Sequence, residues 1–105
     1  MKVSFDFDST LSKLSIQKVA KKFIDNGDEV WITTSRHSNP PINFYTNHLL
    51  FEIAEKLGIK KEHIQFTEGK DKFNFLEGFD LHFDDDVIEI ELIEENLKTC
   101  GVILV

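Results

Sequence analysis

The sequence predicts an α/β fold: a Rossmann-like, three-layer domain with a parallel five-stranded sheet and helices on both faces. Segments with strand-like patterns alternate along the chain with segments whose apolar residues recur at helical spacing. The resulting order is βαβαβαβαβ, and strict alternation favours a parallel sheet with right-handed crossovers. The length of 105 residues corresponds to one small domain.

The first strand and helix are followed by a buried strand. Lys2–Phe7 alternates polar and apolar residues, which is typical of a strand. The apolar residues within Ile16–Ile24 follow helical spacing, and Gly27 provides a left-handed cap at low conformational cost. Glu29–Thr33 has three consecutive apolar residues, which indicates a strand buried on both faces.

A proline-containing loop then leads to the second helix. Pro40 and Pro41 interrupt regular structure and can open the helix that follows. Leu49–Leu57 carries a second apolar stripe at helical spacing, closed by Gly58. His63–Phe66 is predicted to be a short third strand.

The last part of the chain predicts two further helices and two strands. Lys70–Glu77 is a short helix that ends before Gly78, and Asp80–Phe83 is the fourth strand. Val87–Lys98 has helical spacing, and Val102–Val105 is the final strand.

Composition narrows the classes of function. The net charge is 12 − 19 = −7, which disfavours nucleic-acid binding but leaves room for a phosphorylated substrate if a cation is bound. One cysteine, Cys100, excludes an intrachain disulfide and a multi-cysteine zinc site, and we expect it to be a packing residue. No apolar run approaches the ~18 residues of a membrane span. The charged N-terminal strand does not resemble a signal peptide. We expect a cytoplasmic protein without a membrane partner.

Carboxylates follow the first strand, at the sheet edge where open parallel sheets place their functional sites. Asp6 and Asp8 stand at i and i+2 of an extended segment, so their side chains point the same way. Two close carboxylates repel each other and favour a cation or a shared proton. Solvated loop acids, one of them capping the next helix, are an equally good interpretation of this pair alone.

The next two strands end in groups that suit phosphate oxygens. Thr33, Thr34 and Ser35 are followed by Arg36, the one arginine of the chain. A turn with local side-chain hydrogen bonds is the favoured alternative for this segment. After the third strand, Lys70 or Lys72 can point an ammonium group at the strand ends, with Lys72 just inside the helix. A solvent-exposed lysine is the usual alternative.

The fourth strand ends in Asp84-Asp85-Asp86, and no lysine or arginine lies between Glu77 and Glu95. Hard carboxylate oxygens suit Mg²⁺, whereas an acid at a helix start is also a good cap. We assign capping to Asp86 and metal binding to Asp84 and Asp85, because the first strand also ends in acids.

The order of these motifs resembles the haloacid dehalogenase (HAD) superfamily of Mg²⁺-dependent phosphohydrolases. The stretch Phe5–Leu11 matches the D-x-D-x-T/V motif that follows its first strand, and Val30–Thr34 matches the strand ending in threonine or serine. Lys72 or Lys70 matches the lysine ahead of the fourth strand, and Leu81–Asp85 matches the strand ending in paired acids.

The resemblance implies a role for each of these residues. Asp6 would attack phosphorus and form an aspartyl-phosphate, while Asp8 would act as general acid and then as general base. Thr34 and the lysine would hold phosphoryl oxygens. Magnesium would be bound by Asp6, by the backbone carbonyl of Asp8, and by Asp84 or Asp85. Substrate contacts are assigned to Ser35, Arg36 and His37.

One departure from the superfamily concerns the cap. Ser12–Ser15 runs almost directly into the first helix, so residues 1–105 are expected to form a single HAD-like domain without a cap. Such an open site suits a phosphate on a large partner, or closure by a second subunit.

Two alternatives to a phosphohydrolase remain. A receiver-like phospho-acceptor module fits less well, because its acceptor should follow the middle strand and its acid pair should adjoin the first. A non-catalytic, HAD-like Mg²⁺-binding module stays open because the usual flap is missing. Trp31 and His82 are interpreted as core residues.

Overall fold

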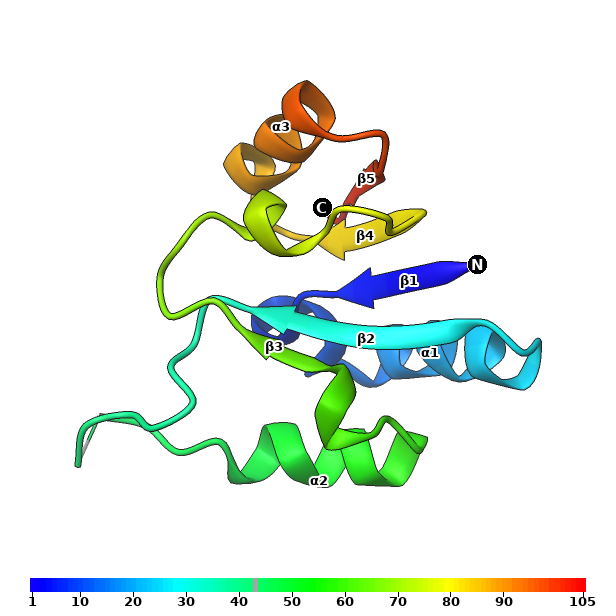
Figure 1. Ribbon diagram of the computed structural model, residues 1–105. Helices are drawn as coiled ribbons and strands as arrows, with labels where there is room; N and C mark the ends of the chain where they lie inside the picture. The colour runs from blue at the N-terminus through cyan, green and yellow to red at the C-terminus, as the bar shows by residue number, and fades with distance from the viewer. Residues whose placement is uncertain (43) are drawn as a thin grey trace.

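The computed structural model describes residues 1–42 and 44–105, and its fold is the predicted α/β class. In this part of the chain, five parallel strands form one sheet in the order β3-β2-β1-β4-β5 (Figure 1). The strands are β1 (Lys2–Phe5), β2 (Glu29–Thr34), β3 (Ile64–Phe66), β4 (Leu81–Asp84) and β5 (Cys100–Ile103). In the central strand, Val3 is paired with Val30 of β2 and Leu81 of β4.

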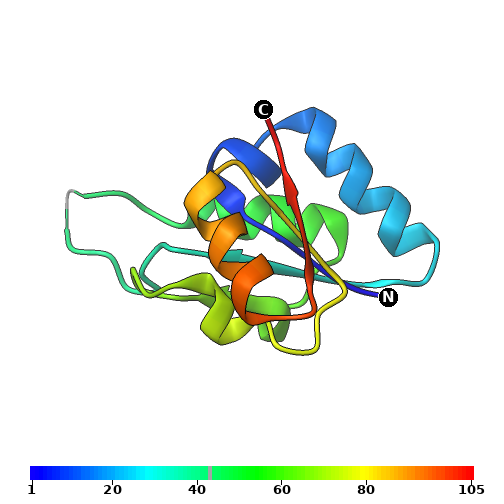
Figure 2. The ribbon, with the colours of Figure 1, turned by 90° about the horizontal axis from the view of Figure 1, so that it is seen from above.

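Helices cover the two faces of the sheet, as predicted. The chain passes from β1 outward to β2 and β3 and then returns to β4 and β5, so right-handed crossovers place the two sets of helices on opposite faces. Figure 2 shows α1 and α3 on opposite sides of the strands. The helices are α1 (Leu14–Asp25) and α2 (His48–Leu57) on one face, and the short 3₁₀ helix η3 (Lys72–Phe75) and α3 (Val87–Asn96) on the other.

Each face has its own apolar cluster. The larger one lies under α1 and α2 and includes Phe5, Ile32 and Leu50. Phe5 stacks on Phe83 of β4 with ring centroids 4.7 Å apart. The smaller cluster, under η3 and α3, contains Leu76, Phe79 and Ile93, with Trp31 packed half-buried against it.

The connections change direction between β1 and β4, and this fixes where a site can form. Helices leave these adjacent strands towards opposite faces, so the chain opens a crevice beyond their carboxyl ends. The backbone N–H of Asp6 donates to the carbonyl of Phe83 at 2.9 Å, which keeps the end of β1 beside the end of β4.

Several element boundaries differ from the prediction. The first strand ends at Phe5, because the chain turns into η1 (Phe7–Leu11), a wide turn in which Leu11 N–H donates to the carbonyl of Asp6 at 3.1 Å. The helix predicted over 70–77 is the single turn η3. It starts at Lys72, whose backbone N–H donates to Glu89 of α3 at 2.9 Å.

Three further element boundaries differ from the prediction. The helix α2 begins at His48, so Pro40 and Pro41 lie in the loop before it and do not open it. The helix α3 ends at Asn96, two residues before the predicted end. The last strand begins at Cys100, which is paired with Leu81, and Cys100 is exposed rather than a packing residue.

None of the helices in the described ranges, 1–42 and 44–105, has the length and apolar character needed to cross a bilayer.

Candidate active site

A polar pocket of about 470 Å³ lies at the carboxyl edge of the sheet, beyond β1, β2 and β4. The predicted residues that line it are Asp6, Asp8, Ser35, Lys72, Asp84 and Asp85. These residues come from four separate segments of the chain. The pocket is open to solvent on one side, where Asp8, Ser35 and Asp85 are exposed.

Lys72 connects the two strands at the floor of this pocket. Its Nζ lies 2.8 Å from Asp6 Oδ1 and 2.6 Å from Asp84 Oδ2. All three side chains are buried, with exposed fractions of 3% for Lys72, 5% for Asp6 and 0% for Asp84. Lys70 is exposed, so the structure places Lys72 rather than Lys70 at the strand ends.

The two buried carboxylates titrate in opposite directions. Burial raises the pKa of Asp6 to about 7, and the ammonium of Lys72 only partly offsets this. Burial also disfavours the ionised form of Asp84. The hydrogen bonds from His82 and Lys72, together with the charge of Lys72, outweigh that penalty, so the pKa of Asp84 is lowered. Lys72 is itself buried, but the two carboxylates raise its pKa and keep it protonated.

His82 is a core residue, as predicted, and it also contacts the site. Its Nε2 lies 2.8 Å from Asp84 Oδ2, and neither side chain is exposed. Burial lowers the pKa of His82. On the other side of the same carboxylate, the backbone N–H of Asp86 donates to Asp84 Oδ1 at 3.1 Å.

A divalent cation fits the acidic cluster at the strand ends. Asp6, Asp84 and Asp85 each offer a carboxylate oxygen, and these atoms lie within 4.8 Å of one another. With the three carboxylates ionised and the Lys72 ammonium beside them, the local charge is −3 + 1 = −2. Oxygen donors and this charge suit a hard cation such as Mg²⁺. The backbone carbonyl of Asp8 stays a prediction as a ligand.

Asp8 is held by an arginine at the pocket rim. Arg36 donates through Nε to Asp8 Oδ2 at 2.9 Å and through Nη2 to Asp8 Oδ1 at 2.7 Å, which is a bidentate pair. The hydrogen bonds from Arg36 outweigh partial burial and lower the pKa of Asp8. Sequence reasoning assigned Arg36 to the substrate and did not foresee this pairing.

Arg36 also anchors the loop that leads to α2. Its Nη1 donates to the carbonyl of Thr46 at 2.9 Å and to Asn47 Oδ1 at 3.3 Å. The guanidinium carbon lies 5.0 Å from the ring centroid of Tyr45 and 5.1 Å from that of Phe7. These contacts join the loop to the same arginine that holds Asp8.

The hydroxyl residues at the end of β2 lie in two different places: Thr34 in the interior and Ser35 at the pocket. Thr34 is fully buried, its Oγ1 accepts a hydrogen bond from Arg36 N–H at 3.2 Å, and it does not line the pocket. Ser35 lines it. His37 lies on the loop, with Nδ1 3.5 Å from Glu68 Oε1.

Thr10, the threonine of the D-x-D-x-T/V match, contributes to the site although no separate role was predicted for it. Its Oγ1 donates to Asp6 Oδ2 at 3.2 Å, so Asp6 accepts hydrogen bonds on both oxygens. The spacing of four residues was visible in the sequence. The turn η1 that folds Thr10 back onto Asp6 was not, because the first strand was predicted to continue to Phe7.

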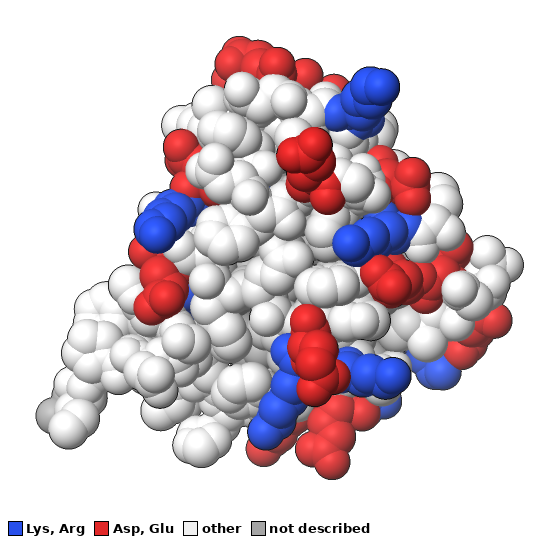
Figure 3. Space-filling model, in the orientation of Figure 1, with Lys and Arg blue, Asp and Glu red and all other residues white. Residues whose placement is uncertain are grey.

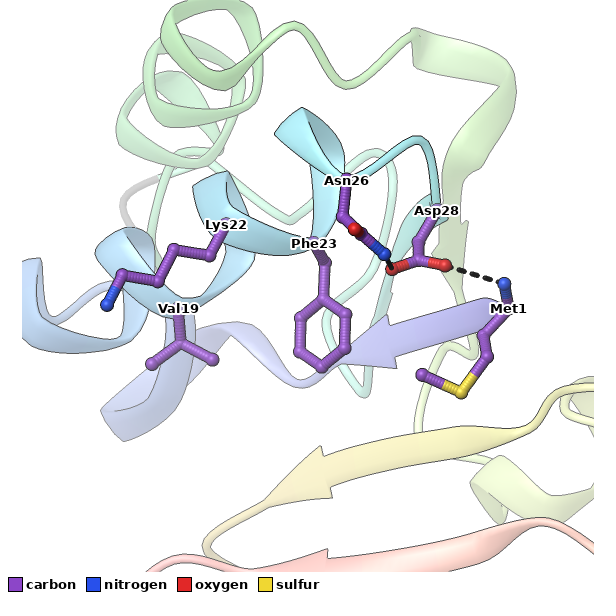
Figure 4. Close-up of a pocket in the computed structure, with 6 residues that line it drawn as sticks. All are labelled: Met1, Val19, Lys22, Phe23, Asn26 and Asp28. Atoms are coloured by element: carbon purple, nitrogen blue, oxygen red, sulfur yellow. Dashed lines mark hydrogen bonds and ion pairs between the residues drawn. The ribbon is translucent and has the colours of Figure 1, made fainter.

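A second pocket, of about 450 Å³, lies at the opposite edge of the sheet, where β1 begins and α1 ends (Figure 4). Val19, Phe23 and the side chain of Met1 form its apolar walls. Asp28 pairs with the N-terminal ammonium at 2.6 Å. Among the described residues, the group with metal-ligand spacing is Asp6, Asp84 and Asp85 at the other edge of the sheet, and this second pocket contains none of them.

No protein-family model matches this chain, and no curated protein is similar enough to it to count as a match. The function proposed below therefore rests on the geometry and charge of the site.

Proposed function

We propose that this protein is a Mg²⁺-dependent phosphohydrolase of the HAD type, which cleaves a phosphate monoester through an aspartyl-phosphate on Asp6. The observation that carries the proposal is the position of Asp6. Its carboxylate lies at the floor of an open polar pocket, bonded to Lys72 and within reach of the same cation as Asp84 and Asp85. Enzyme function and membership of the superfamily are both part of this proposal.

The chain's own residues account for each step. The substrate phosphate would enter beside Ser35 and Lys72, which donate to its oxygens. One oxygen of Asp6 would attack phosphorus while the bond to the leaving oxygen breaks. That oxygen takes a proton from Asp8 or, for an acidic phenol or similar leaving group, departs as the anion. Water would then attack phosphorus, transfer a proton to Asp8, and release phosphate and free Asp6.

The metal has a limited and definite task in this scheme. Held by Asp6, Asp84 and Asp85, Mg²⁺ would neutralise the repulsion between the carboxylate nucleophile and the anionic phosphate. The charge of −2 at the cluster leaves that position suited to a divalent cation.

One observation favours a second candidate, a non-catalytic Mg²⁺-binding or phospho-acceptor module. A general acid must carry a proton, but Asp8 is held as a carboxylate by two hydrogen bonds from Arg36. If Arg36 stays on Asp8 when the substrate binds, Asp6 would be phosphorylated, but the phosphate would be released from it only slowly.

The substrate is proposed to be a phosphate on a large partner. Only η1 and two further residues separate Asp6 from α1, so the chain forms no cover over the pocket at this point. Residues 38–47 include no charged residue. The described residues of this loop, 38–42 and 44–47, lie beside the site and project at the lower left of Figure 3. Ile42 and Phe44 in this loop are 92% and 71% exposed. They offer an apolar contact to a substrate too large for the pocket.

Phosphate release from an aryl phosphate tests this function. We expect steady release with Mg²⁺, loss of release with EDTA, and loss in Asp6→Asn. Asp71→Asn is the matched control, because Asp71 is an exposed aspartate beside Lys72 that does not line the pocket. Phosphate that accumulates on Asp6 without turnover would favour the second candidate. Release that does not depend on Asp6 would refute both.

A further inference from the structure

We propose that His82 is a positioning residue for cation binding, because it fixes the carboxylate of Asp84 through its Nε2–H. The inference rests on the metal site of the proposed function, but it does not require turnover. His82 never reaches the pocket and is not a metal ligand in this account.

His82 and Asp84 are neighbours on one face of β4. Residues at i and i+2 of a strand point to the same side, and both side chains have no exposed surface. The distance of 2.8 Å between His82 Nε2 and Asp84 Oδ2 is that of a charge-assisted hydrogen bond. A buried imidazole in the middle of a five-stranded sheet is costly unless it has such a partner.

The three donors around Asp84 determine which acceptor sites remain. Oδ2 accepts from both Lys72 Nζ and His82 Nε2, which uses its two lone pairs. Oδ1 accepts from the backbone N–H of Asp86 and keeps one lone pair. The carboxylate is therefore fixed in rotation, and its remaining acceptor site belongs to Oδ1.

The protonation of His82 suits this task. Its Nδ1 is buried and has no hydrogen-bond partner within residues 1–42 and 44–105, so a proton there would be a buried donor without an acceptor among them. The proton is therefore on Nε2, and the ring is neutral. A neutral donor orients Asp84 without adding a second positive charge beside Lys72, and so leaves the cluster at −2 for a cation. Such outer partners tune metal affinity in many metal sites.

Mg²⁺ binding measured by calorimetry tests the inference, with wild type, His82→Gln, His82→Asn and His82→Leu compared at equal pH. The glutamine amide can reach the position of Nε2, whereas the asparagine amide is too short and leucine has no donor. We expect His82→Gln to bind Mg²⁺ within a few-fold of wild type. We expect His82→Asn and His82→Leu to bind about 10- to 100-fold more weakly.

Ser4→Ala is the matched control. Ser4 is a buried polar residue paired with His82 in the sheet register, and its Oγ bonds to Thr33 rather than to the acidic cluster. We expect it to lower thermal stability in EDTA without changing Mg²⁺ affinity. His82→Asn keeps a polar side chain of smaller size, so the test does not depend on His82→Leu folding.

The outcomes separate this inference from the proposed function. Equal Mg²⁺ affinity in wild type and His82→Asn would overturn the role of His82. An equal loss of Mg²⁺ affinity in Ser4→Ala and His82→Asn would overturn it as well. Wild type that binds no Mg²⁺ would refute the metal site and the inference with it. Mg²⁺ binding with the expected order of variants, but without phosphate release, would support the inference and refute the phosphohydrolase.

Discussion

The ammonium of Lys72 brings together two carboxylates that would otherwise repel each other in the interior. It bonds to Asp6 at 2.8 Å and to Asp84 at 2.6 Å, from an element that follows neither strand directly. Removing one partner from a buried ionic group leaves the other charges without compensation, which costs more than the pair contributes when intact. The stability of the site therefore depends strongly on this one side chain.

We predict that Lys72→Met lowers the free energy of unfolding by about 3–5 kcal/mol, because Asp6 and Asp84 lose their shared cation. Urea denaturation in EDTA measures this change. Lys70→Met serves as the control, since Lys70 is exposed and its loss should stay within about 0.5 kcal/mol. Equal effects of the two substitutions would contradict the assignment of Lys72.

The raised pKa of Asp6 predicts a pH-dependent stability for the metal-free protein. The native state keeps this proton up to a pKa of about 7, whereas an unfolded aspartate loses it near its usual value of 3.8. Between these values the native state binds more protons, so the contribution of Asp6 to stability falls as the pH rises from 3.8 to about 7 and then becomes constant. The lowered pKa of Asp84 makes its contribution to stability rise with pH instead. Because Asp84 is present in both wild type and a variant changed only at Asp6, its contribution cancels when the two are compared.

The stability of Asp6→Asn relative to wild type should therefore increase by about 2.5 kcal/mol between pH 5 and pH 8. Denaturation in EDTA at the two pH values measures the difference. A stability difference that is the same at pH 5 and pH 8 would show that Asp6 does not titrate in this range.

Which residues lie at the site could be predicted from the sequence better than which hydrogen bonds and ion pairs these residues form. Asp6, Asp84 and Asp85 were placed together because parallel strands end at one edge of the sheet. Lys70 and Lys72 could not be separated, since the start of η3 depends on a hydrogen bond to Glu89, which lies seventeen residues further along the chain. The pairing of Arg36 with Asp8 depends on how the loop folds back, and no local pattern encodes it.

At the scale of elements, the start of α3 has two adjacent acids with different tasks. Asp86 caps the helix, because its Oδ1 accepts from Ile88 N–H at 3.0 Å and from Glu89 N–H at 3.4 Å. Asp85 is exposed and belongs to the acidic cluster that we propose as the cation site. The sequence predicted this division, and the structure confirms the capping half of it.

Asp86→Ala is predicted to lower the free energy of unfolding by about 1 kcal/mol, the usual cost of losing a cap, and to leave Mg²⁺ affinity unchanged. Asp85→Ala should weaken Mg²⁺ binding and leave the free energy of unfolding nearly unchanged. Chemical denaturation and calorimetric titration of both variants give the two quantities. If Asp86→Ala also weakened Mg²⁺ binding, the assignment of Asp86 to helix capping alone would be wrong.

Strands were predicted more reliably than the connections between them. All five follow apolar patterns that tertiary packing preserves, and their boundaries differ from the prediction by a few residues at most. The segment after β1 was missed because η1 is closed by hydrogen bonds that span five residues, and Ser9 adopts a positive φ of 58°. Neither feature follows from hydrophobic periodicity.

At the scale of the whole molecule, the return of the chain from β3 to β4 creates the site. Asp6 and Asp84 are far apart in sequence, and they meet because β4 is inserted beside β1 rather than beyond β3. The same topology leaves the loop over 38–47 at the carboxyl edge, joined to the site through Arg36. The prediction of a single domain over residues 1–105 is consistent with this arrangement but stays a prediction.

The double variant Ile42→Ser, Phe44→Ser tests the contact with a large substrate. We predict an approximately tenfold higher KM towards phosphorylated proteins, because loss of the two apolar contacts together should cost about 1.4 kcal/mol of binding free energy. The kinetic constants towards a small aryl phosphate should not change. A change in both substrates would place the loop in the chemistry of the site instead.

Chemical trapping of an aspartyl-phosphate on Asp6 tests the proposed phosphohydrolase most directly. Wild type mixed with an aryl phosphate and Mg²⁺, quenched within a single turnover and treated with borohydride, should contain homoserine at position 6, because borohydride reduces an acyl phosphate to an alcohol. Mass spectrometry of the peptide around Asp6 detects this product. We expect homoserine at position 6 with Mg²⁺ and none with EDTA. Rapid phosphate release with an unmodified Asp6 under these conditions would contradict it.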